Sequence, residues 1–157
     1  MSEAANSPLV EFRDVSFSHA SASSPVISHL SFSVRQGETL VLLGESGCGK
    51  TTTLKLINRL LLPSSGEVLV EGKTTTEWDV IRLRRRTGYV IQEGGLFPHF
   101  TVERNVGLVP ALEHWDKTKI KRRVDELLSI VGLEPNDFAQ RYPGELSGGQ
   151  RQRIGVA

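Results

Sequence analysis

A single cysteine, Cys48, is present in the 157-residue sequence, which excludes an intrachain disulfide and a metal site built from clustered cysteines. Lysine and arginine (19) nearly balance aspartate and glutamate (18), so there is no overall basic field to gather nucleic acid or anionic lipid. The longest apolar run, Leu40–Leu43, is far shorter than the roughly 20 residues of a membrane span. We expect a cytoplasmic chain that reaches a membrane only through a partner.

The composition suits one globular domain, with 38% hydrophobic and 24% charged residues. Alternating apolar residues predict antiparallel strands over Val10–Phe17 and Val26–Val34. The short apolar run Thr39–Leu43 predicts a strand that is covered on both faces and central in a parallel sheet. Apolar residues at helical spacing follow over Lys50–Leu62. This part of the chain therefore has the order strand, glycine loop, helix.

Further elements extend this pattern to an α/β fold. Short strands are predicted over Glu67–Val70 and Gly88–Ile91, and a basic helical stretch lies between them at Val80–Arg86. A longer helix with one apolar stripe is predicted over Thr118–Val131, where Gly132 ends it.

The segment from Gly44 to Thr51 fits the phosphate-loop pattern G-x-x-x-x-G-K-[ST] between a predicted strand and a predicted helix. Its glycines let the backbone N–H groups and the helix N-terminus point at anionic oxygens. Lys50 is expected to reach the β- and γ-phosphates of a nucleotide, and the Thr51 hydroxyl to ligate Mg²⁺. The candidate nucleotide-binding residues are Gly44, Ser46, Gly47, Cys48, Gly49, Lys50, Thr51 and Thr52.

Cys48 admits a different hypothesis, a nucleophilic thiolate in a phosphatase loop at a helix N-terminus. Such a loop would need an arginine six residues further on, where this sequence has Leu54. We interpret Cys48 as a small residue that fits the loop.

A second motif selects among the classes of nucleotide-binding protein. The segment Leu146–Gln150 reads Leu-Ser-Gly-Gly-Gln and resembles the signature of the ATP-binding-cassette (ABC) ATPases, whereas the Asn-Lys-x-Asp motif of GTPases is absent. A serine hydroxyl, two glycine N–H groups and a helix N-terminus can form a second anion site, or an ordinary helix cap. The resemblance implies ATP and Mg²⁺ as ligands and a dimer, with the signature on the γ-phosphate held by a second subunit. The signature residues are Leu146, Ser147, Gly148, Gly149 and Gln150.

Gln92 ends a predicted strand and matches the Q-loop glutamine of that family, which implies contact with Mg²⁺ and the attacking water rather than a plain surface position. The apolar and aromatic stretch that follows has two interpretations. Leu96, Phe97, His99 and Phe100 are either core residues or part of the groove that receives a helix of the transmembrane partner.

Two further features have competing interpretations. His19 takes the place of the family's adenine-stacking aromatic residue, although a solvated loop histidine is the alternative. The cluster of Arg82 and Arg84–Arg86 suggests RNA in isolation, but the net charge of +1 favours a solvated face and no direct nucleic-acid partner.

The resemblance implies a P-loop NTPase core of ABC ATPase type with a small antiparallel β subdomain and a helical subdomain. We expect a single, incomplete domain over 1–157, with the β subdomain and P-loop core at about 10–96. The helical subdomain is expected at about 97–147, and the signature helix starts within 148–157.

The C-terminal part of the core sheet is expected to be missing. The sequence runs out within the helix that begins near Gln150, while Ile154 and Val156 still need apolar partners, as in a fragment of a longer protein. The family's Walker B strand, catalytic glutamate and switch histidine have no counterpart. No substitute base is assigned, because none of the candidate carboxylates ends an apolar strand: Glu93, Glu113 and Glu145.

Three segments are most similar to ATPase subunits of importers for quaternary-amine osmoprotectants: Phe97–His99, Asn105–Pro110 and Arg141–Ser147. The resemblance implies an energy-coupling subunit that binds ATP, pairs with a second ATPase subunit and drives a transmembrane permease from the cytoplasmic face of the membrane. Two alternatives stay open: a non-catalytic nucleotide-binding fragment, and a soluble ABC protein that acts on ribosomes or DNA.

Overall fold

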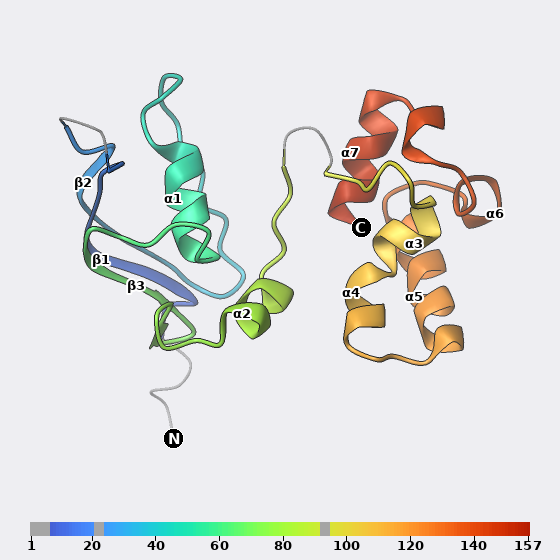
Figure 1. Cartoon of the computed structure of the whole chain (residues 1–157), viewed down its shortest axis with the longest axis horizontal. Helices are drawn as coiled ribbons and strands as arrows, with labels where there is room; N and C mark the ends of the chain where they lie inside the picture. The colour runs from blue at the N-terminus through green and yellow to red at the C-terminus, as the bar shows by residue number, and fades with distance from the viewer. Residues whose placement is uncertain (1–6, 21–23, 92–94) are drawn as a thin grey trace. The chain divides into compact units, whose positions relative to one another are not determined.

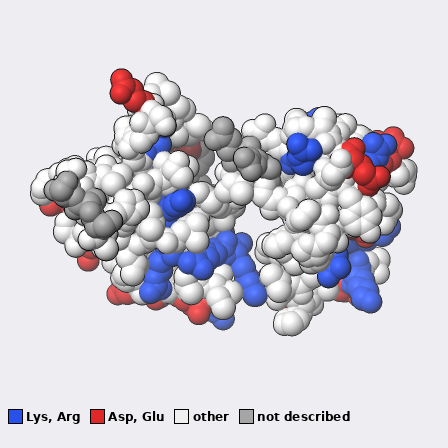
Figure 2. Space-filling model, turned by 45° about the horizontal axis from the view of Figure 1, so that its top comes forward, with Lys and Arg blue, Asp and Glu red and all other residues white. Residues whose placement is uncertain are grey.

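The computed structural model describes residues 7–20, 24–91 and 95–157, which form two compact units (Figure 1). The first unit extends to Gly88 and combines a sheet with two helices, and the second extends from Tyr89 to Ala157 and is helical. Lys and Arg side chains gather along one side of the surface of the first unit (Figure 2).

The sheet of the first unit has four strands in the order β2-β1-β3-β4, and each neighbouring pair is antiparallel. Helix α1 packs against β3, and their apolar residues share one core. The strands are β1 (Val10–Phe17), β2 (Ile27–Val34), β3 (Ser65–Val70) and β4 (Lys73–Thr74). The buried core residues of this unit are Phe12, Val15, Phe17, Ile27, Leu56 and Val68.

The ladder between β1 and β2 has two irregularities, and each contains a residue with left-handed backbone: Asp14 (φ 51°) in β1 and His29 (φ 50°) in β2. The backbone N–H groups of both residues bond serine side chains of the other strand. The Asp14 N–H donates to Ser31 Oγ (2.9 Å), and the His29 N–H donates to Ser16 Oγ (3.0 Å). The His29 ring also lies 2.8 Å from the Asp14 carboxylate. The irregular register of this hairpin is therefore supported by specific hydrogen bonds.

Helix α1 spans Lys50–Ile57 and ends well before Leu62, where the apolar periodicity ends. The chain turns at Arg59, which has a left-handed φ of 53°. The Arg59 N–H donates to the Leu56 carbonyl, and the next amide along the chain donates to the Lys55 carbonyl. These two bonds form the turn that commonly closes a helix, usually with glycine in place of the arginine.

The arginine cluster lies on helix α2 (Val80–Arg86), and its four side chains are exposed, as expected for a solvated face, although some of them also bond other elements. Arg84 donates to the carbonyls of residues 58 and 59, at 3.2 and 2.8 Å, and so closes the end of α1. Arg86 pairs with Glu71 at 2.8 Å. Trp78 is held against β3, because its indole N–H donates to the Val70 carbonyl at 3.1 Å.

The prediction of strands over residues 39–43 and 88–91 is wrong for this structure. Neither segment joins a β-ladder within the described residues, and Leu40, Val41 and Leu43 are 45%, 67% and 88% exposed. An apolar pattern indicates which side chains could be buried, but a strand also needs a neighbouring strand to which its backbone can hydrogen-bond. The two segments have no such neighbour in the described part of the chain.

The second unit packs its helices around one apolar core. Its longest helix, α5, has 14 residues, and no helix in the described ranges is long and apolar enough to cross a membrane. The helices are α3 (Val102–Val106), α4 (Leu108–Leu112), α5 (Lys117–Ile130), α6 (Pro135–Phe138), a 3₁₀ turn at Pro143–Glu145 and α7 (Gly148–Val156). The buried core residues are Val102, Val124, Leu128, Leu133, Ala139, Leu146 and Ile154.

Asp116 caps the N-terminus of α5. Its carboxylate accepts the backbone N–H groups of Thr118 (2.8 Å) and Lys119 (3.3 Å). These bonds favour the charged form and hold the pKa of Asp116 below its usual value. Trp115 lies next to this cap, with the Lys119 ammonium 3.8 Å from its ring centre.

Candidate functional site

The phosphate loop has a backbone that only glycine adopts readily. Gly44, Gly47 and Gly49 have φ angles of 155°, 88° and 97°, and Gly49 is the N-cap of α1. A Cβ atom on Gly44 would lie 2.6 Å from Cys48 Sγ, and one on Gly49 would lie 3.1 Å from the Val26 carbonyl oxygen. Side chains at these two positions would therefore push the loop open.

The ammonium group of Lys50 lies within the curve of this loop. Its Nζ donates to the carbonyls of Gly44 (2.8 Å) and Glu45 (2.7 Å) and lies 3.4 Å from Cys48 Sγ. The loop thus surrounds a positive charge at the start of a helix whose N-cap, Gly49, makes no side-chain hydrogen bond, so the first N–H groups have no partner within the helix. Such a centre attracts an anion of the size of phosphate.

The threonine hydroxyls at the start of α1 differ in exposure and in hydrogen bonding. Thr51 is exposed, and its side chain has no hydrogen-bond partner among the described residues. The Thr53 hydroxyl is buried and donates to the Gly49 carbonyl at 3.0 Å. Thr51 is therefore the most exposed of the three threonines and the one that suits a cation ligand. Thr52 is half-buried beside it, and Ser46 lies in the exposed turn of the loop.

The signature segment forms the N-terminus of α7. Ser147 is the N-cap: its Oγ accepts the Gln150 N–H at 3.2 Å, and the Gln150 side-chain oxygen accepts the Ser147 N–H at 2.8 Å. Gly148 and Gly149 are exposed and have space for a side chain, since no atom approaches a Cβ on Gly149 within 4 Å. Leu146 is buried in the helical core. The bare glycines leave the helix N-terminus open to an approaching group.

Helix α7 is bonded to the helical core of its unit. Arg153 donates to the carbonyls of Val131 and Gly132, both at 3.1 Å, and so closes the C-terminus of α5. Ile154 is 2% exposed, which corrects the expectation that it lacks partners, whereas Val156 is 63% exposed. The role of Arg153 could not be predicted, because a side-chain hydrogen bond to a carbonyl 21 or 22 residues away leaves no periodic pattern in the sequence.

The remaining predicted residues lie at separate places. His19 is exposed, with its ring edge-on to Phe17 at 5.0 Å between ring centres. Gln92 lies outside the described residues. Leu96 packs against the helical core, whereas Phe97 and His99 are exposed, so the stretch divides between the two interpretations. The phosphate loop belongs to the first unit and the signature to the second.

Comparison with known proteins identifies the family that combines these two features. Residues 27–157 match the family described as ABC transporter, so the chain belongs to that family. The fold agrees with this assignment. A similar solved structure is titled the dimeric structure of a post-hydrolysis state of the ATP-binding cassette MJ0796 bound to ADP and Pi. Its sequence is 29% identical, its TM-score is 0.84, and the match covers 94% of this chain and 67% of that chain.

Three similar relatives carry names from osmoprotectant transport. The chain is 53% identical to the osmoprotectant import ATP-binding protein OsmV of Salmonella typhimurium and 50% identical to the glycine betaine/carnitine/choline transport ATP-binding protein OpuCA of Bacillus subtilis. Each match covers 83% of this chain and 34% of the relative. It is 46% identical to the glycine betaine uptake system ATP-binding protein YehX of Escherichia coli, over 91% of this chain and 47% of the relative. The chain thus spans a third to a half of the length of these relatives.

Proposed function

We propose that this chain is the nucleotide-binding part of an ATP-binding subunit that energises a membrane importer of quaternary-amine osmoprotectants. The observation that carries the proposal is the presence in one chain of a glycine loop around the Lys50 ammonium and an open, serine-capped helix start at Ser147. The substrate class is supported by the names of relatives that are 46% to 53% identical.

The proposed ligand of the phosphate loop is ATP with Mg²⁺. Lys50 would exchange its carbonyl partners for β- and γ-phosphate oxygens, and the free Thr51 hydroxyl would hold the cation. Mg²⁺ neutralises the developing charge on the phosphates when it is bound. Gln92 is proposed as a second contact to the cation and to the attacking water, and His19 as a contact to adenine.

The proposed assembly contains two ATP-binding subunits and a transmembrane permease. Ser147 and the bare N–H groups of Gly148 and Gly149 are proposed to bind the γ-phosphate held by the other subunit. In the intact dimer, ATP hydrolysis would drive transport. Because membrane contact is proposed to be made by the permease, we place the subunit on the cytoplasmic face of the membrane.

The test compares Lys50→Ala with Ser147→Arg in the full-length protein. Lys50→Ala should weaken ATP binding by about 10-fold or more, as expected for the loss of a charge-assisted contact. Ser147→Arg should leave ATP binding by the monomer unchanged and abolish ATP-driven dimerisation in sedimentation. Unchanged ATP affinity in Lys50→Ala contradicts the assignment of the loop, and a dimer that persists in Ser147→Arg contradicts the assignment of the signature.

The substrate class is tested in proteoliposomes that contain the full-length subunit and its permease. ATP-dependent uptake of glycine betaine or choline is expected, and methionine serves as the control substrate. Uptake of methionine without uptake of either quaternary amine contradicts the proposed substrate.

A further inference from the structure

The direction of helix α7 decides where the bare N–H groups of the signature point. In an α-helix the backbone N–H bonds lie nearly parallel to the axis and point toward the N-terminus. The N–H groups of Gly148 and Gly149, at the start of α7, therefore point out of the helix along its axis. A tilt of α7 would redirect these groups without breaking the helix.

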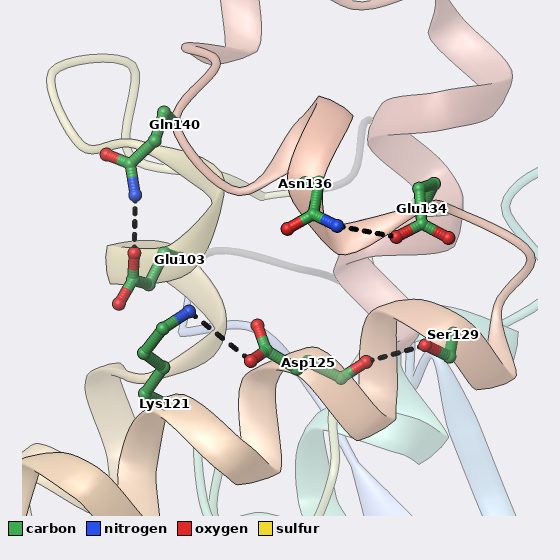
Figure 3. Close-up of polar contacts among 7 residues, drawn as sticks. All are labelled: Glu103, Lys121, Asp125, Ser129, Glu134, Asn136 and Gln140. Carbon is green, nitrogen blue, oxygen red and sulfur yellow. Dashed lines mark hydrogen bonds and ion pairs between the residues drawn. The ribbon is translucent and has the colours of Figure 1, made fainter.

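The start of α7 is held by the segment that leads into it. The Gln140 side chain donates to the Glu103 carboxylate at 2.6 Å (Figure 3). The backbone carbonyls on either side of Gln140 accept the first two N–H groups of α3, both at 2.9 Å. Leu146, next to the N-cap of α7, is buried in the helical core. These contacts fix one point of the helix, which leaves its direction to be set by a second point.

Arg153 supplies the second point. Its Nη1 donates to the carbonyls of Val131 and Gly132, both at 3.1 Å. Gly132 has a left-handed φ of 70°, and a Cβ there would lie 3.4 Å from this nitrogen, so the guanidinium lies directly against the turn that ends α5. The neighbouring Ile154 is also buried, but apolar burial has no preferred direction, whereas hydrogen bonds have one.

The turn that Arg153 contacts is itself firmly built. The N–H groups of Gly132 and Leu133 donate to the carbonyls of residues 129 (3.0 Å) and 128 (2.9 Å), which is the pair of bonds of a Schellman motif. The Ser129 hydroxyl also donates to the Asp125 carbonyl at 2.9 Å (Figure 3). The motif does not use the carbonyls of residues 131 and 132, so the guanidinium has two acceptors on a fixed support.

We propose that Arg153 is the positioning residue of the signature: it sets the direction of α7 and thereby aims the N–H groups of Gly148 and Gly149 at the γ-phosphate held by the other subunit. The inference rests on the proposed function. Arg153 is exposed, so its bonds compete with water and add little to the stability of the unit. Its role in direction is therefore separable from stability.

The experiment replaces Arg153 in the full-length protein. Arg153→Met keeps a long, unbranched side chain and removes every donor. ATP-driven dimerisation in sedimentation should weaken by about 10-fold, because the N–H groups lose their direction. ATP affinity of the monomer should stay within about twofold, and Tm should fall by less than about 4 °C. Because both bonds come from one nitrogen, the ammonium of Arg153→Lys should restore dimerisation to within about threefold of wild type.

Two control variants separate position from charge and from stability. Arg123→Met makes the same chemical change on α5, at an exposed arginine that pairs with Glu126 at 2.8 Å, and should dimerise normally. Val131→Ala removes part of a side chain that packs against the helical core but keeps the carbonyl to which Arg153 donates. It should lower Tm more than Arg153→Met does and leave dimerisation unchanged.

Each outcome decides for or against the inference. Wild-type dimerisation in Arg153→Met overturns it, as do equal losses in Arg153→Met and Val131→Ala, since dimerisation would then follow stability. If Arg153→Met fails to fold, or if Arg153→Lys is as impaired as Arg153→Met, the inference is overturned as well. Failure of the proposed function would be visible in the wild-type protein itself, as absent ATP binding or absent ATP-driven dimerisation.

Discussion

The two glycine-rich segments of this chain differ in what requires their glycines. In the phosphate loop, Gly44 and Gly49 have left-handed backbone and leave no room for a Cβ. In the signature, Gly148 and Gly149 lie in a regular helix with open space around them. The fold of the chain itself therefore requires the first pair, whereas nothing in the described structure requires the second pair.

The largest expected effect tests whether the two units are independent. Leu128→Ala removes a side chain that is 0% exposed in the core of the second unit and should cost about 2–5 kcal/mol of stability there. ATP affinity, which depends on the first unit, should persist. Urea unfolding followed by hydrogen exchange measures the stability of each unit, and titration with a fluorescent ATP analogue measures the affinity. Ile130→Ala, on the same helix but 70% exposed, is the control and should change stability by less than about 0.5 kcal/mol.

The next prediction concerns the glycines that the fold requires. Gly44→Ala should lower ATP affinity by about 10-fold or more, because the added methyl group collides with Cys48 Sγ and displaces the partners of Lys50. Titration with a fluorescent ATP analogue measures the change. Gly88→Ala, where a Cβ meets no atom within 4 Å, should bind ATP normally. Equal affinities in the two variants would contradict a loop that needs glycine at position 44.

In the signature, replacing a glycine is expected to stabilise the fold rather than disturb it. Gly149→Ala should raise the stability of the second unit by about 0.5–1 kcal/mol, because alanine is a better helix former and the space is open. The same variant should lose ATP-driven dimerisation. Thermal unfolding and sedimentation with ATP and Mg²⁺ give the two readings. A destabilised variant would show that the chain's own fold needs this glycine.

The smallest expected effect is a pH dependence at the start of α5. The pKa of Asp116 is lowered in the folded chain, so its cap contributes fully above the unfolded pKa of about 3.9 and is lost as the pH falls through the lower folded pKa. Asp116→Asn keeps an acceptor but does not titrate. The difference in Tm between wild type and variant should therefore shrink between pH 6 and pH 3. A difference in Tm that stays constant over this pH range would show that the charge of the Asp116 carboxylate does not contribute to stability.

Local chemistry made the glycine-rich loop before α1 and the helix start at Ser147 predictable. The phosphate loop and the signature are contiguous motifs whose residue types are set by steric and hydrogen-bond requirements within a few residues. The strand predicted over 39–43 failed because pairing depends on a neighbour that the apolar pattern does not report. Arg153 and Arg84 were missed for a related reason: each bonds backbone carbonyls, and such bonds follow no periodicity.

The positions of Trp78 and Trp115 have a practical consequence. They are the two tryptophans of the sequence, and one lies in each unit. Trp78 is half-buried and donates its indole N–H to the Val70 carbonyl, whereas Trp115 is exposed beneath the Lys119 ammonium. Their fluorescence should therefore differ in emission wavelength and in quenching by iodide. With one tryptophan at a time replaced by phenylalanine, each half of the molecule carries its own optical reporter, and no dye need be attached.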